Sequence, residues 1–476
     1  MMHHCMRLCG AAILFAALLA CRGPELTQET AVEPSRGNHA FVGANVIPMT
    51  GDSGLLPDQT VLVRGGVIEA IGHRADVTIP SDFRRIDATG QYLIPGLVDM
   101  HVHLEHFRSP EVLKLFVANG VVAIRNMDGR PYILQWRESV RNGSMIGPTI
   151  YTAGPILDGD PPLLDDNTVV RNAMEAAAAV RDQARTGYDF IKVYTNLSEE
   201  AYRAILSEAR EQGLAVAGHV PRRVPVTVAF EAGQVSIEHL DGYDELIEAE
   251  DSPHRDGWHW SKLYLAMPAD PAKIPAAAAG AARARVWNVP TLVQSGKVNA
   301  PDVMRSWLSE PTMAYVPGNL RRYWAPENRD PYSRRLLEGF GDEELEILQR
   351  GRENRSRMVL ALHEAGAGLL VGTDTPNPFV VPGFSIHEEL ENFVHAGLDP
   401  LEALAAATHD AARFLGSLNA FGTIEEGKQA QLVLLRANPV EAIANTRSIA
   451  GVMVGGAWLS EEQLEVLLRE VASAYR

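Results

Sequence analysis

The sequence predicts an α/β protein with a parallel sheet between two β-rich flanks, and three observations support this. Between residues 93 and 415, short apolar runs typical of buried strands alternate with segments of helical pattern. Residues 39–92 contain short strand-like runs separated by turns, and so does the chain after residue 416. The apolar fraction of 46% over 476 residues allows a sizeable core and more than one minimal domain.

The two flanks show the same kind of strand pattern. In the first flank, residues 60–64 and 67–72 are apolar runs separated by two glycines. In the second flank, residues 431–435 and 451–458 look similar. We therefore expect β structure at both ends of the folded chain.

The region between the flanks alternates strand and helix signals. The strand candidates are residues 92–100, 121–125, 149–152, 188–194, 214–219, 235–239, 289–293 and 369–374. The helix candidates include residues 173–186, 198–212 and 342–365. Ser198 is followed by two glutamates, which is typical of a capped helix start.

The N-terminus has the pattern of an export signal. Arg7 precedes an apolar stretch, residues 10–20, that is too short to span a bilayer. The residues Leu-Leu-Ala-Cys ending at Cys21 resemble a bacterial lipobox, in which cleavage leaves this cysteine as the lipidated first residue. The alternative is an ordinary signal peptide with an incidental cysteine. We predict a signal peptide at 1–20, a flexible tether at 21–38 and an exported bacterial lipoprotein, periplasmic or at the cell surface.

Cysteine usage and charge restrict the chemistry and the partners. All three cysteines, Cys5, Cys9 and Cys21, lie near the N-terminus, so cleavage at Cys21 would leave no disulfide and no thiolate ligand. No later segment has the roughly 20 continuous apolar residues of a membrane span, so we expect the membrane to be contacted only through the lipid anchor. The net charge of -17 argues against a nucleic-acid partner and is typical of a solvated surface.

Two histidines follow the first apolar run of the central region. His101 and His103 come at the end of the predicted strand 92–100. Residues two apart on a strand point to the same side, so both imidazoles can reach one metal ion. Four more potential ligands each end a strand-like run, and they are Lys192, His219, His239 and Asp374. Imidazole and carboxylate are zinc-type ligands, and a buried lysine is unfavourable unless it is paired, metal-bound or neutralised.

This order of ligands at successive strand ends resembles the amidohydrolase superfamily of binuclear metal hydrolases. The run from Leu93 to His103 is close to the signature of that family. The chain looks most similar to the branch of metal-dependent prolidases and Xaa-amino-acid dipeptidases. The resemblance covers nearly everything after the first forty residues. It implies a (β/α)8 barrel over residues 93–415, with a small β-sandwich built from residues 39–92 and 416–476, the last part including a C-terminal helix.

The resemblance also implies two divalent metal ions, zinc by ligand type, although cobalt or manganese would suit the same donors. One ion would be held by His101, His103 and Asp374, the other by His219 and His239, and Lys192 would bridge them as a carbamate. An unmodified lysine in a mononuclear enzyme is the alternative. A hydroxide shared by the ions would be the nucleophile. Asp374 would take its proton and pass it to the leaving amine, first as general base and then as general acid.

Two further residues are candidates for substrate binding. Tyr194 lies two positions after Lys192 and therefore faces the same side of the strand, where its hydroxyl could donate to a developing oxyanion. The alternative is an aromatic residue of the barrel wall. His387 lies in a sequence segment, residues 384–391, that also occurs in relatives, which suggests a place near the site. Packing at the start of a helix is the competing interpretation. The arginines that could bind a substrate carboxylate or simply be solvated are Arg125, Arg222, Arg223, Arg321 and Arg322.

Two segments do not fit the alternation of strands and helices. Residues 244–275 follow the sixth strand candidate, and residues 296–341 follow the seventh. The second segment is rich in proline, tryptophan and tyrosine. Loops after barrel strands commonly form lids and substrate pockets, and self-packing surface elaboration is the alternative.

We therefore predict an enzyme, a metal-dependent amidohydrolase that cleaves an amide bond in a dipeptide or N-acyl amino acid. A lactone, an organophosphate or a cyclic amide is the alternative substrate, because the metal chemistry does not separate carbonyl from phosphoryl centres. A non-catalytic ligand-binding lipoprotein is disfavoured because the ligand set is complete. The expected partner is a small molecule or short peptide, and a homo-oligomer is possible.

Overall fold

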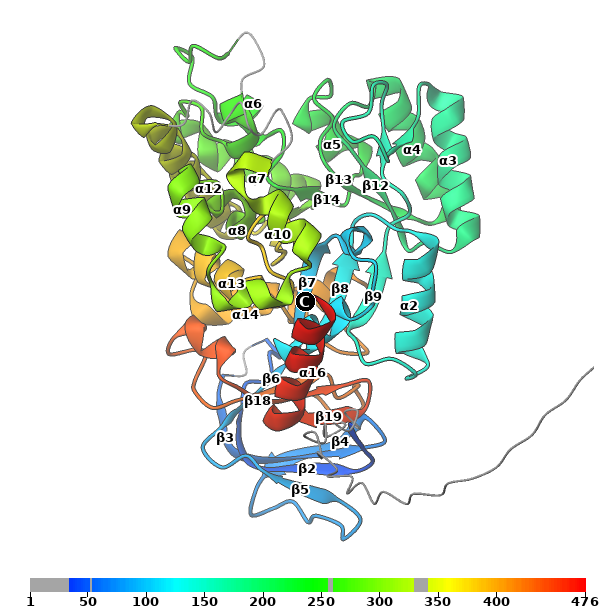
Figure 1. Ribbon diagram of the computed structural model, residues 1–476, viewed down its shortest axis with the longest axis vertical. Helices are drawn as coiled ribbons and strands as arrows, with labels where there is room; N and C mark the ends of the chain where they lie inside the picture. Colours follow the sequence, from blue (N-terminus) through cyan, green and yellow to red (C-terminus); the bar gives the residue numbers. More distant parts are fainter. Residues whose placement is uncertain (1–33, 52–53, 256–259, 329–340) are drawn as a thin grey trace, which may run out of the picture. The chain divides into compact units, whose positions relative to one another are not determined.

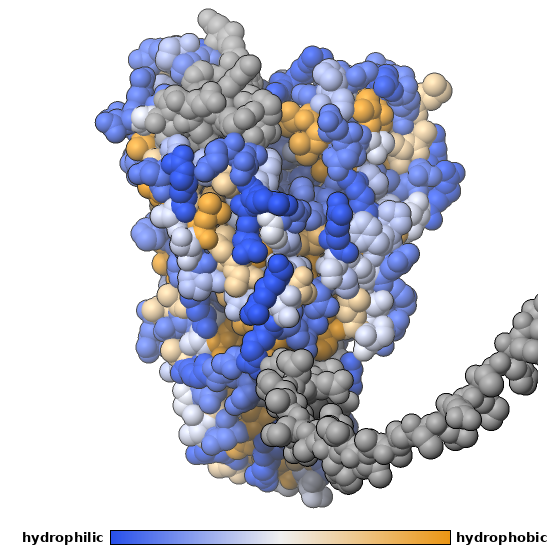
Figure 2. Space-filling view, viewed as in Figure 1, coloured by the Kyte–Doolittle hydropathy of each residue, from blue (hydrophilic) through white to orange (hydrophobic). Residues whose placement is uncertain are grey.

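The computed structural model describes residues 34–51, 54–255, 260–328 and 341–476, and residues 34–476 belong to one compact unit. The predicted signal peptide, Cys21 and most of the predicted tether lie outside the described residues. Within the described part, no helix combines the length and the apolar character that crossing a bilayer would require. The face in Figure 2 is mostly hydrophilic, with hydrophobic side chains scattered over it.

The first architectural part is a sheet domain made from both ends of the chain (Figure 1). Its strands are β1 (Ser35–Arg36), β2 (His39–Val46), β3 (Leu56–Arg64), β4 (Val67–His73), β5 (Arg84–Asp87), β6 (Tyr92–Pro95), β17 (Leu432–Leu435), β18 (Ile449–Val454) and β19 (Ala457–Ser460). Their order is β1-β19-β18-β17-β6-β2-β3-β4, with β5 paired to β2. The pairing of β17 with β6 joins the two flanks that the sequence predicts to be β-rich.

The sheet folds over an apolar core. Strands β2 and β19 are separated by three others in the sheet order, so in a flat sheet they would lie about 19 Å apart. Phe41 of β2 and Trp458 of β19 nevertheless have ring centroids 5.0 Å apart. Val61, Leu93 and Leu434 belong to the same buried cluster. The strands therefore wrap around a common interior in the manner of a sandwich.

One boundary differs from the prediction. Ser35 and Arg36, which the sequence assigns to the flexible tether, form β1 and pair antiparallel with Trp458 and Ala457 of β19. The predicted tether at 21–38 is therefore wrong for these two residues, because their backbone groups complete the edge of the sheet.

The second architectural part is a barrel of parallel strands. The strands that pair in order around it are β7 (Leu97–Val102), β8 (Val121–Asn126), β9 (Thr149–Thr152), β12 (Phe190–Val193), β13 (Ala215–Gly218), β14 (Ser236–Glu238), β15 (Trp287–Val289) and β16 (Gly368–Leu369). Six of the neighbouring pairs in this series form regular ladders, and all six ladders are parallel. Two short strands, β10 (Leu157–Asp158) and β11 (Thr168–Val169), extend the sheet beside β12.

Backbone hydrogen bonds close the ring at both remaining junctions. A parallel bridge joins Ala153, just after β9, to Phe190 of β12. On the other side, the Met100 N–H donates to the Val371 carbonyl at 3.0 Å and the Asp374 N–H donates to the His101 carbonyl at 2.8 Å. The chain after β16 thus continues beside β7 and brings the eighth strand position next to the first.

Helices follow the strands as the alternation predicts. The α-helices are α1 (Val112–Ala118), α2 (Pro131–Arg141), α3 (Ala173–Thr186), α4 (Glu199–Gln212), α5 (Val226–Ala232), α6 (Tyr243–Ile247), α7 (Ile274–Ala284), α8 (Leu292–Gly296), α9 (Pro301–Trp307), α10 (Gly318–Trp324), α12 (Asp342–Glu364), α13 (Ser385–Ala396), α14 (Pro400–Ala406), α15 (His409–Phe414) and α16 (Glu461–Ala474). The 3₁₀ helices are η1 (Leu104–His106), η2 (Trp260–Tyr264), η3 (Pro271–Lys273), η4 (Pro311–Tyr315), η5 (Pro326–Asn328) and η6 (Ile443–Arg447). The predicted cap is present, because the Ser198 hydroxyl accepts from the Ala201 N–H at 3.2 Å.

Three strand predictions need correction. The predicted strand 369–374 is reduced to β16, which ends at Leu369. The run 92–100 is divided at Gly96, so that β6 joins the sheet domain and β7 joins the barrel. A Cβ at Gly96 would lie 2.3 Å from Val122, so only glycine allows this close crossing. The predicted strand 289–293 ends at Val289, because Thr291 adopts a left-handed backbone with φ of 47° and α8 begins at the next residue.

The two predicted insertions contain short helices. The first holds η2 and η3, and its residues 256–259 lie outside the described residues. The second holds α9, η4, α10 and η5, and its residues 329–340 lie outside them. Met304 and Trp324 of the second insertion form a buried cluster with Phe379 and Val381, which belong to the loop after Asp374. This insertion therefore packs on itself and on a loop that begins at a candidate ligand, while its function as a lid stays a prediction.

Candidate metal centre

The six candidate ligands come together at the C-terminal ends of the barrel strands. His101 lies in β7 and Lys192 in β12, and the others follow directly or closely after a strand; they are His103, His219, His239 and Asp374. Ring centroids are 5.3 Å apart for His101 and His103, 4.7 Å for His101 and His239, and 4.9 Å for His219 and His239. The C-terminal end of a barrel is where strand-borne side chains converge on a reacting molecule.

Three of the four candidate histidines lie around the carboxylate of Asp374. Its Oδ1 lies 3.3 Å from His101 Nε2 and 3.4 Å from His103 Nε2, and its Oδ2 lies 3.8 Å from His239 Nδ1. The residue has a left-handed backbone with φ of 63°, and its N–H is held by the His101 carbonyl. Such strained positions persist only where the surroundings fix them, and they cluster at functional sites. Donor atoms of His101, His239 and Asp374 lie close enough together to hold one metal ion.

Lys192 is fully buried, and its Nζ has no hydrogen-bond partner among the described residues. The Nζ lies 6.0 Å from the ring centroid of Tyr194, whose ring is 4.2 Å from that of His219. Burial lowers the pKa of Lys192, which favours the neutral amine with a free lone pair. The structure thus places Tyr194 on the same side as Lys192, as the spacing predicts, beside one of the candidate ligands.

Each of the four histidines has its Nδ1 near an oxygen. The partners are Glu238 Oε2 for His101 at 2.8 Å, Glu105 Oε1 for His103 at 2.7 Å, Thr195 Oγ1 for His219 at 3.0 Å and Thr291 Oγ1 for His239 at 2.7 Å. An Nδ1–H that donates to such an oxygen leaves the Nε2 lone pair free for a metal. Burial lowers the pKa of His101, His219 and His239 well below the usual value, so these rings are neutral.

Sequence reasoning missed a buried ion pair behind this centre. Arg125, interpreted above as solvated or as a ligand for a substrate carboxylate, is 1% exposed and lies 2.8 Å from Glu238. Both interpretations of Arg125 are therefore wrong, because its guanidinium is used inside the barrel. The sequence did contain a signal for this role of Glu238, because a charged residue stands inside an apolar strand directly before His239.

Asp99 is a second buried carboxylate that the sequence did not single out. Its Oδ1 accepts from the His101 N–H at 3.2 Å and from the Thr373 N–H at 3.0 Å, and its Oδ2 accepts from the Thr373 hydroxyl at 2.7 Å. Asp99 therefore ties the strand that carries the two histidines to the chain segment that carries Asp374.

The remaining substrate-binding candidate, His387, is buried where helix α13 packs against η6. Its Nδ1 lies 2.9 Å from the Thr446 hydroxyl, at the contact between α13 and η6. Burial lowers the pKa of His387 to about 3. This environment resembles the helix-start packing that competes with substrate binding, and the substrate-binding prediction remains a prediction.

The donor set suits divalent metal ions. Imidazole nitrogen and carboxylate oxygen are ligands of zinc, cobalt and manganese. Besides the Lys192 amine, the buried His101 Nε2 has no hydrogen-bond partner within the described chain. Two buried polar atoms without partners are unfavourable unless something binds them, and one of them, His101 Nε2, faces the Asp374 carboxylate. The residues present therefore fit a bound metal.

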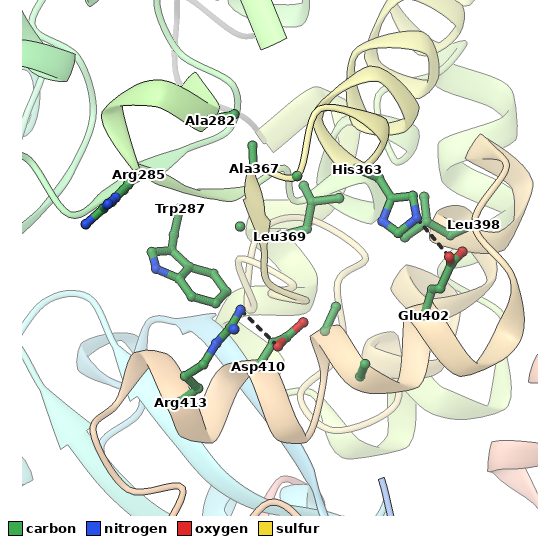
Figure 3. Close-up of a pocket in the computed structure, with 14 residues that line it drawn as sticks. Ala282, Arg285, Trp287, His363, Ala367, Leu369, Leu398, Glu402, Asp410 and Arg413 are labelled. Atoms are coloured by element: carbon green, nitrogen blue, oxygen red, sulfur yellow. Dashed lines mark hydrogen bonds and ion pairs between the residues drawn. The ribbon is translucent and has the colours of Figure 1, made fainter. Parts of the chain in front are cut away.

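A cavity of about 460 Å³ lies at the opposite end of the strands, next to the start of β15 and β16 (Figure 3). Trp287 and Leu369 line it, a hydrogen bond joins His363 to Glu402, and an ion pair joins Arg413 to Asp410 at its walls. None of the candidate ligands lines this cavity, so it is separate from the metal centre.

Comparison with known proteins gives consistent matches over most of the chain. The Amidohydrolase family matches residues 92–459. The chain is 23% identical to ochratoxinase from Aspergillus niger, over 85% of this chain and 84% of the relative. It is similar to the solved structure of bottromycin amidohydrolase, with 26% identity, a TM-score of 0.72 and coverage of 92% and 90%. It is also similar to a Xaa-Pro dipeptidase with bound methionine, with 19% identity, a TM-score of 0.64 and coverage of 89% and 100%.

A parallel eight-stranded barrel with imidazole and carboxylate donors at its C-terminal end defines a class of hydrolases with a metal site. The family match covers well over half of the sequence. The chain therefore belongs to the amidohydrolase family. The predictions of the family, of a barrel with a sheet domain and of an amide-hydrolysing enzyme are confirmed.

Proposed function

We propose that this protein hydrolyses an amide bond in a dipeptide or N-acyl amino acid, using two divalent metal ions, zinc by ligand type. The observation that carries the proposal is the gathering of six N and O donors at the C-terminal end of the barrel, where Asp374 lies 3.3–3.8 Å from three of the histidines. Two of the six donor atoms are buried and have no partner in the described part of the chain. Bound ions would supply an acidified water molecule and would polarise the carbonyl of the substrate.

The names of two similar solved structures favour an amide substrate. Bottromycin amidohydrolase and a Xaa-Pro dipeptidase are similar to this chain along nearly its whole length. A lactone, an organophosphate or a cyclic amide is the alternative substrate. No observation of this structure favours that alternative over a dipeptide or an acyl-amino acid.

The ligands divide into two sets in this proposal. One ion would be held by His101, His103 and Asp374, and the other by His219 and His239. Lys192 would bridge them after its neutral amine forms a carbamate, in which a new N–C bond joins Nζ to carbon dioxide and a proton is released. The lowered pKa of Lys192 supports this step, because only the neutral amine has a lone pair for the bond.

Asp374 is the proposed proton carrier. A carboxylate 3.3–3.4 Å from two imidazole Nε2 atoms has its second oxygen directed toward His239, within the same centre. It would accept a proton from the attacking water and donate it to the nitrogen of the leaving amine. Tyr194, packed against His219, would donate from its hydroxyl to the substrate oxygen that gains negative charge.

The test is turnover by the purified, zinc-loaded protein on a mixed panel of Xaa-Pro and Xaa-Arg dipeptides, N-acyl amino acids, a lactone and a phosphotriester. Asp374→Asn serves as the control. Amine release that disappears in the control is the expected result. Turnover confined to the lactone or the phosphotriester would keep the metal centre and overturn the proposed substrate class.

We further propose that the protein is a lipoprotein attached to a bacterial membrane through Cys21. The lipobox-like residues before Cys21 support this proposal. Mass analysis of the protein extracted from membranes should show an acylated N-terminus at Cys21. A soluble, unmodified product that starts elsewhere would refute it.

A further inference from the structure

We infer that Arg125 and Glu238 are positioning residues that fix the orientation and tautomer of His101, and that one metal ion depends on them. The inference rests on the proposed function, because it takes His101 to be a metal ligand. It assigns a role to a buried ion pair that neither contacts the substrate side of the centre nor supplies a ligand itself.

Glu238 connects His101 to the ion pair. Its Oε2 lies 2.8 Å from His101 Nδ1, and the same oxygen lies 2.9 Å from Arg125 Nη2. Its Oε1 accepts from Arg125 Nη2 at 2.8 Å and from the Ser236 hydroxyl at 2.6 Å. Every side-chain oxygen of Glu238 is thus occupied by a donor, which leaves the carboxylate a single orientation.

Arg125 is fixed in turn by the strand that carries His101. Its Nε donates to the Met100 carbonyl at 2.7 Å, and its Nη1 donates to the Ser236 hydroxyl at 2.9 Å. The guanidinium therefore links β8 to β7 and β14. A planar guanidinium with several simultaneous bonds sets both the position and the direction of the carboxylate.

The result for His101 is a defined tautomer. A carboxylate can only accept at this distance, so His101 Nδ1 carries the proton and its Nε2 carries the lone pair. That Nε2 is the atom 3.3 Å from Asp374 Oδ1, and it has no hydrogen-bond partner in the part of the chain that the structure describes. Carboxylates also lie near Nδ1 of His103 (Glu105, 2.7 Å) and of His219 (Asp241, 3.1 Å), whereas the near partner of His239 Nδ1 is the neutral Thr291 hydroxyl. Among these carboxylates, Glu238 is the one held by a buried arginine.

Stability alone gives a weak reason for this arrangement. Glu238 is 0% and Arg125 1% exposed, and removing two charges from water offsets most of their mutual attraction. A well-packed apolar pair would hold the barrel interior at least as well. Groups that orient a ligating histidine typically change metal affinity 10- to 100-fold when they are mutated.

The test compares metal binding by the full chain carrying Glu238→Gln with the wild type. A second variant, Arg125→Met combined with Glu238→Gln, removes both charges and so avoids an unpaired buried guanidinium. The matched control is Glu248→Gln, because Glu248 is also buried, pairs with Lys262 at 2.9 Å and accepts from the Ser252 hydroxyl at 2.6 Å. Each protein is titrated with zinc against a competing chelator, and its cobalt form is examined by visible absorption.

The expected result is a 10- to 100-fold weaker binding of one of two zinc equivalents in both Glu238 variants. Their cobalt spectrum should change, while the double variant melts in chelator at the wild-type temperature. The Glu248→Gln protein should bind both equivalents normally. Unchanged affinity and spectrum in the double variant would overturn the inference.

The failure of the proposed function has a different signature. A wild-type protein that binds no zinc would overturn the proposed metal centre and, with it, the role of the ion pair. If the wild type and the Glu238 variants all bind two equivalents of zinc equally well, the proposed function stands and only the inference about Arg125 and Glu238 is refuted.

Discussion

Replacing Lys192 by methionine should change stability in opposite directions without and with metal. In the metal-free protein, the buried Lys192 amine has no hydrogen-bond partner among residues 34–51, 54–255, 260–328 and 341–476, which costs about 1–3 kcal/mol. Methionine removes this cost but has one heavy atom fewer, and the side chain is packed tightly enough that a Cβ on Gly218 would come within 3.0 Å of Lys192 Cδ. Allowing about 1 kcal/mol for the lost packing, we expect a net gain of about 0–2 kcal/mol.

The assay is thermal unfolding of both proteins in chelator and in zinc with bicarbonate. In chelator the Lys192→Met protein should melt up to about 2 °C above the wild type, because a chain of this length loses roughly 1 kcal/mol of stability per degree near its midpoint. With zinc at about 100 times its dissociation constant, the wild type should gain about 2.7 kcal/mol per ion and become the more stable protein.

The control variant is Lys262→Met, because the Nζ of Lys262 has a partner, Glu248, at 2.9 Å. This variant should melt below the wild type under both conditions. A Lys192→Met protein that melts below the wild type in chelator would refute the argument from the unpartnered amine. An equal gain on adding zinc would show that Lys192 is not a ligand.

Three further changes test the surroundings of the site. Gly372→Ala should weaken zinc binding in a competition titration and cost about 1–3 kcal/mol, because the added Cβ would lie 2.9 Å from the His101 backbone nitrogen; unchanged binding would contradict this. His387→Gln should reduce the acid sensitivity of the metal-free protein. The folded pKa of His387 lies near 3, below the value of 6.5 in the unfolded chain, so its contribution is present above pH 6.5 and is lost as the pH falls. The wild type should therefore lose about 2 kcal/mol more than the variant between pH 7 and 5 in parallel melts, and equal losses would count against burial as the cause. Ser198→Ala should lower stability by about 1 kcal/mol in denaturant titrations without changing zinc affinity, and no loss would mean that the cap is replaced by water.

Local patterns were sufficient for much of the fold. Helix α3 has the predicted bounds, and α4 begins directly after its predicted cap. The eight strand candidates occupy the eight barrel positions, although only the third, residues 149–152, has the predicted bounds, and the first, seventh and eighth differ most. These successes have a common cause, since apolar periodicity and caps depend on residues that are close together in the sequence.

The ends of the elements were harder to predict. The division of residues 92–100 at Gly96 depends on how closely the chain passes Val122. The end of β15 depends on the left-handed conformation of Thr291, whose hydroxyl is engaged by His239. Neither contact leaves a signal in the neighbouring residues, because each partner comes from another strand.

The sequence by itself determined the order of the six candidate ligands and the strands that present them, because each ligand lies at or next to the end of an apolar run, and His101 and His103 share the first of these runs. The tertiary structure decided which atoms face the centre. His101 and Glu238 are 137 positions apart, and only the register of β7, β8 and β14 brings the Arg125–Glu238 pair behind the imidazole. Hydrogen bonds act over about 3 Å, so the orientation of a ligand is set by whatever the fold places beside it.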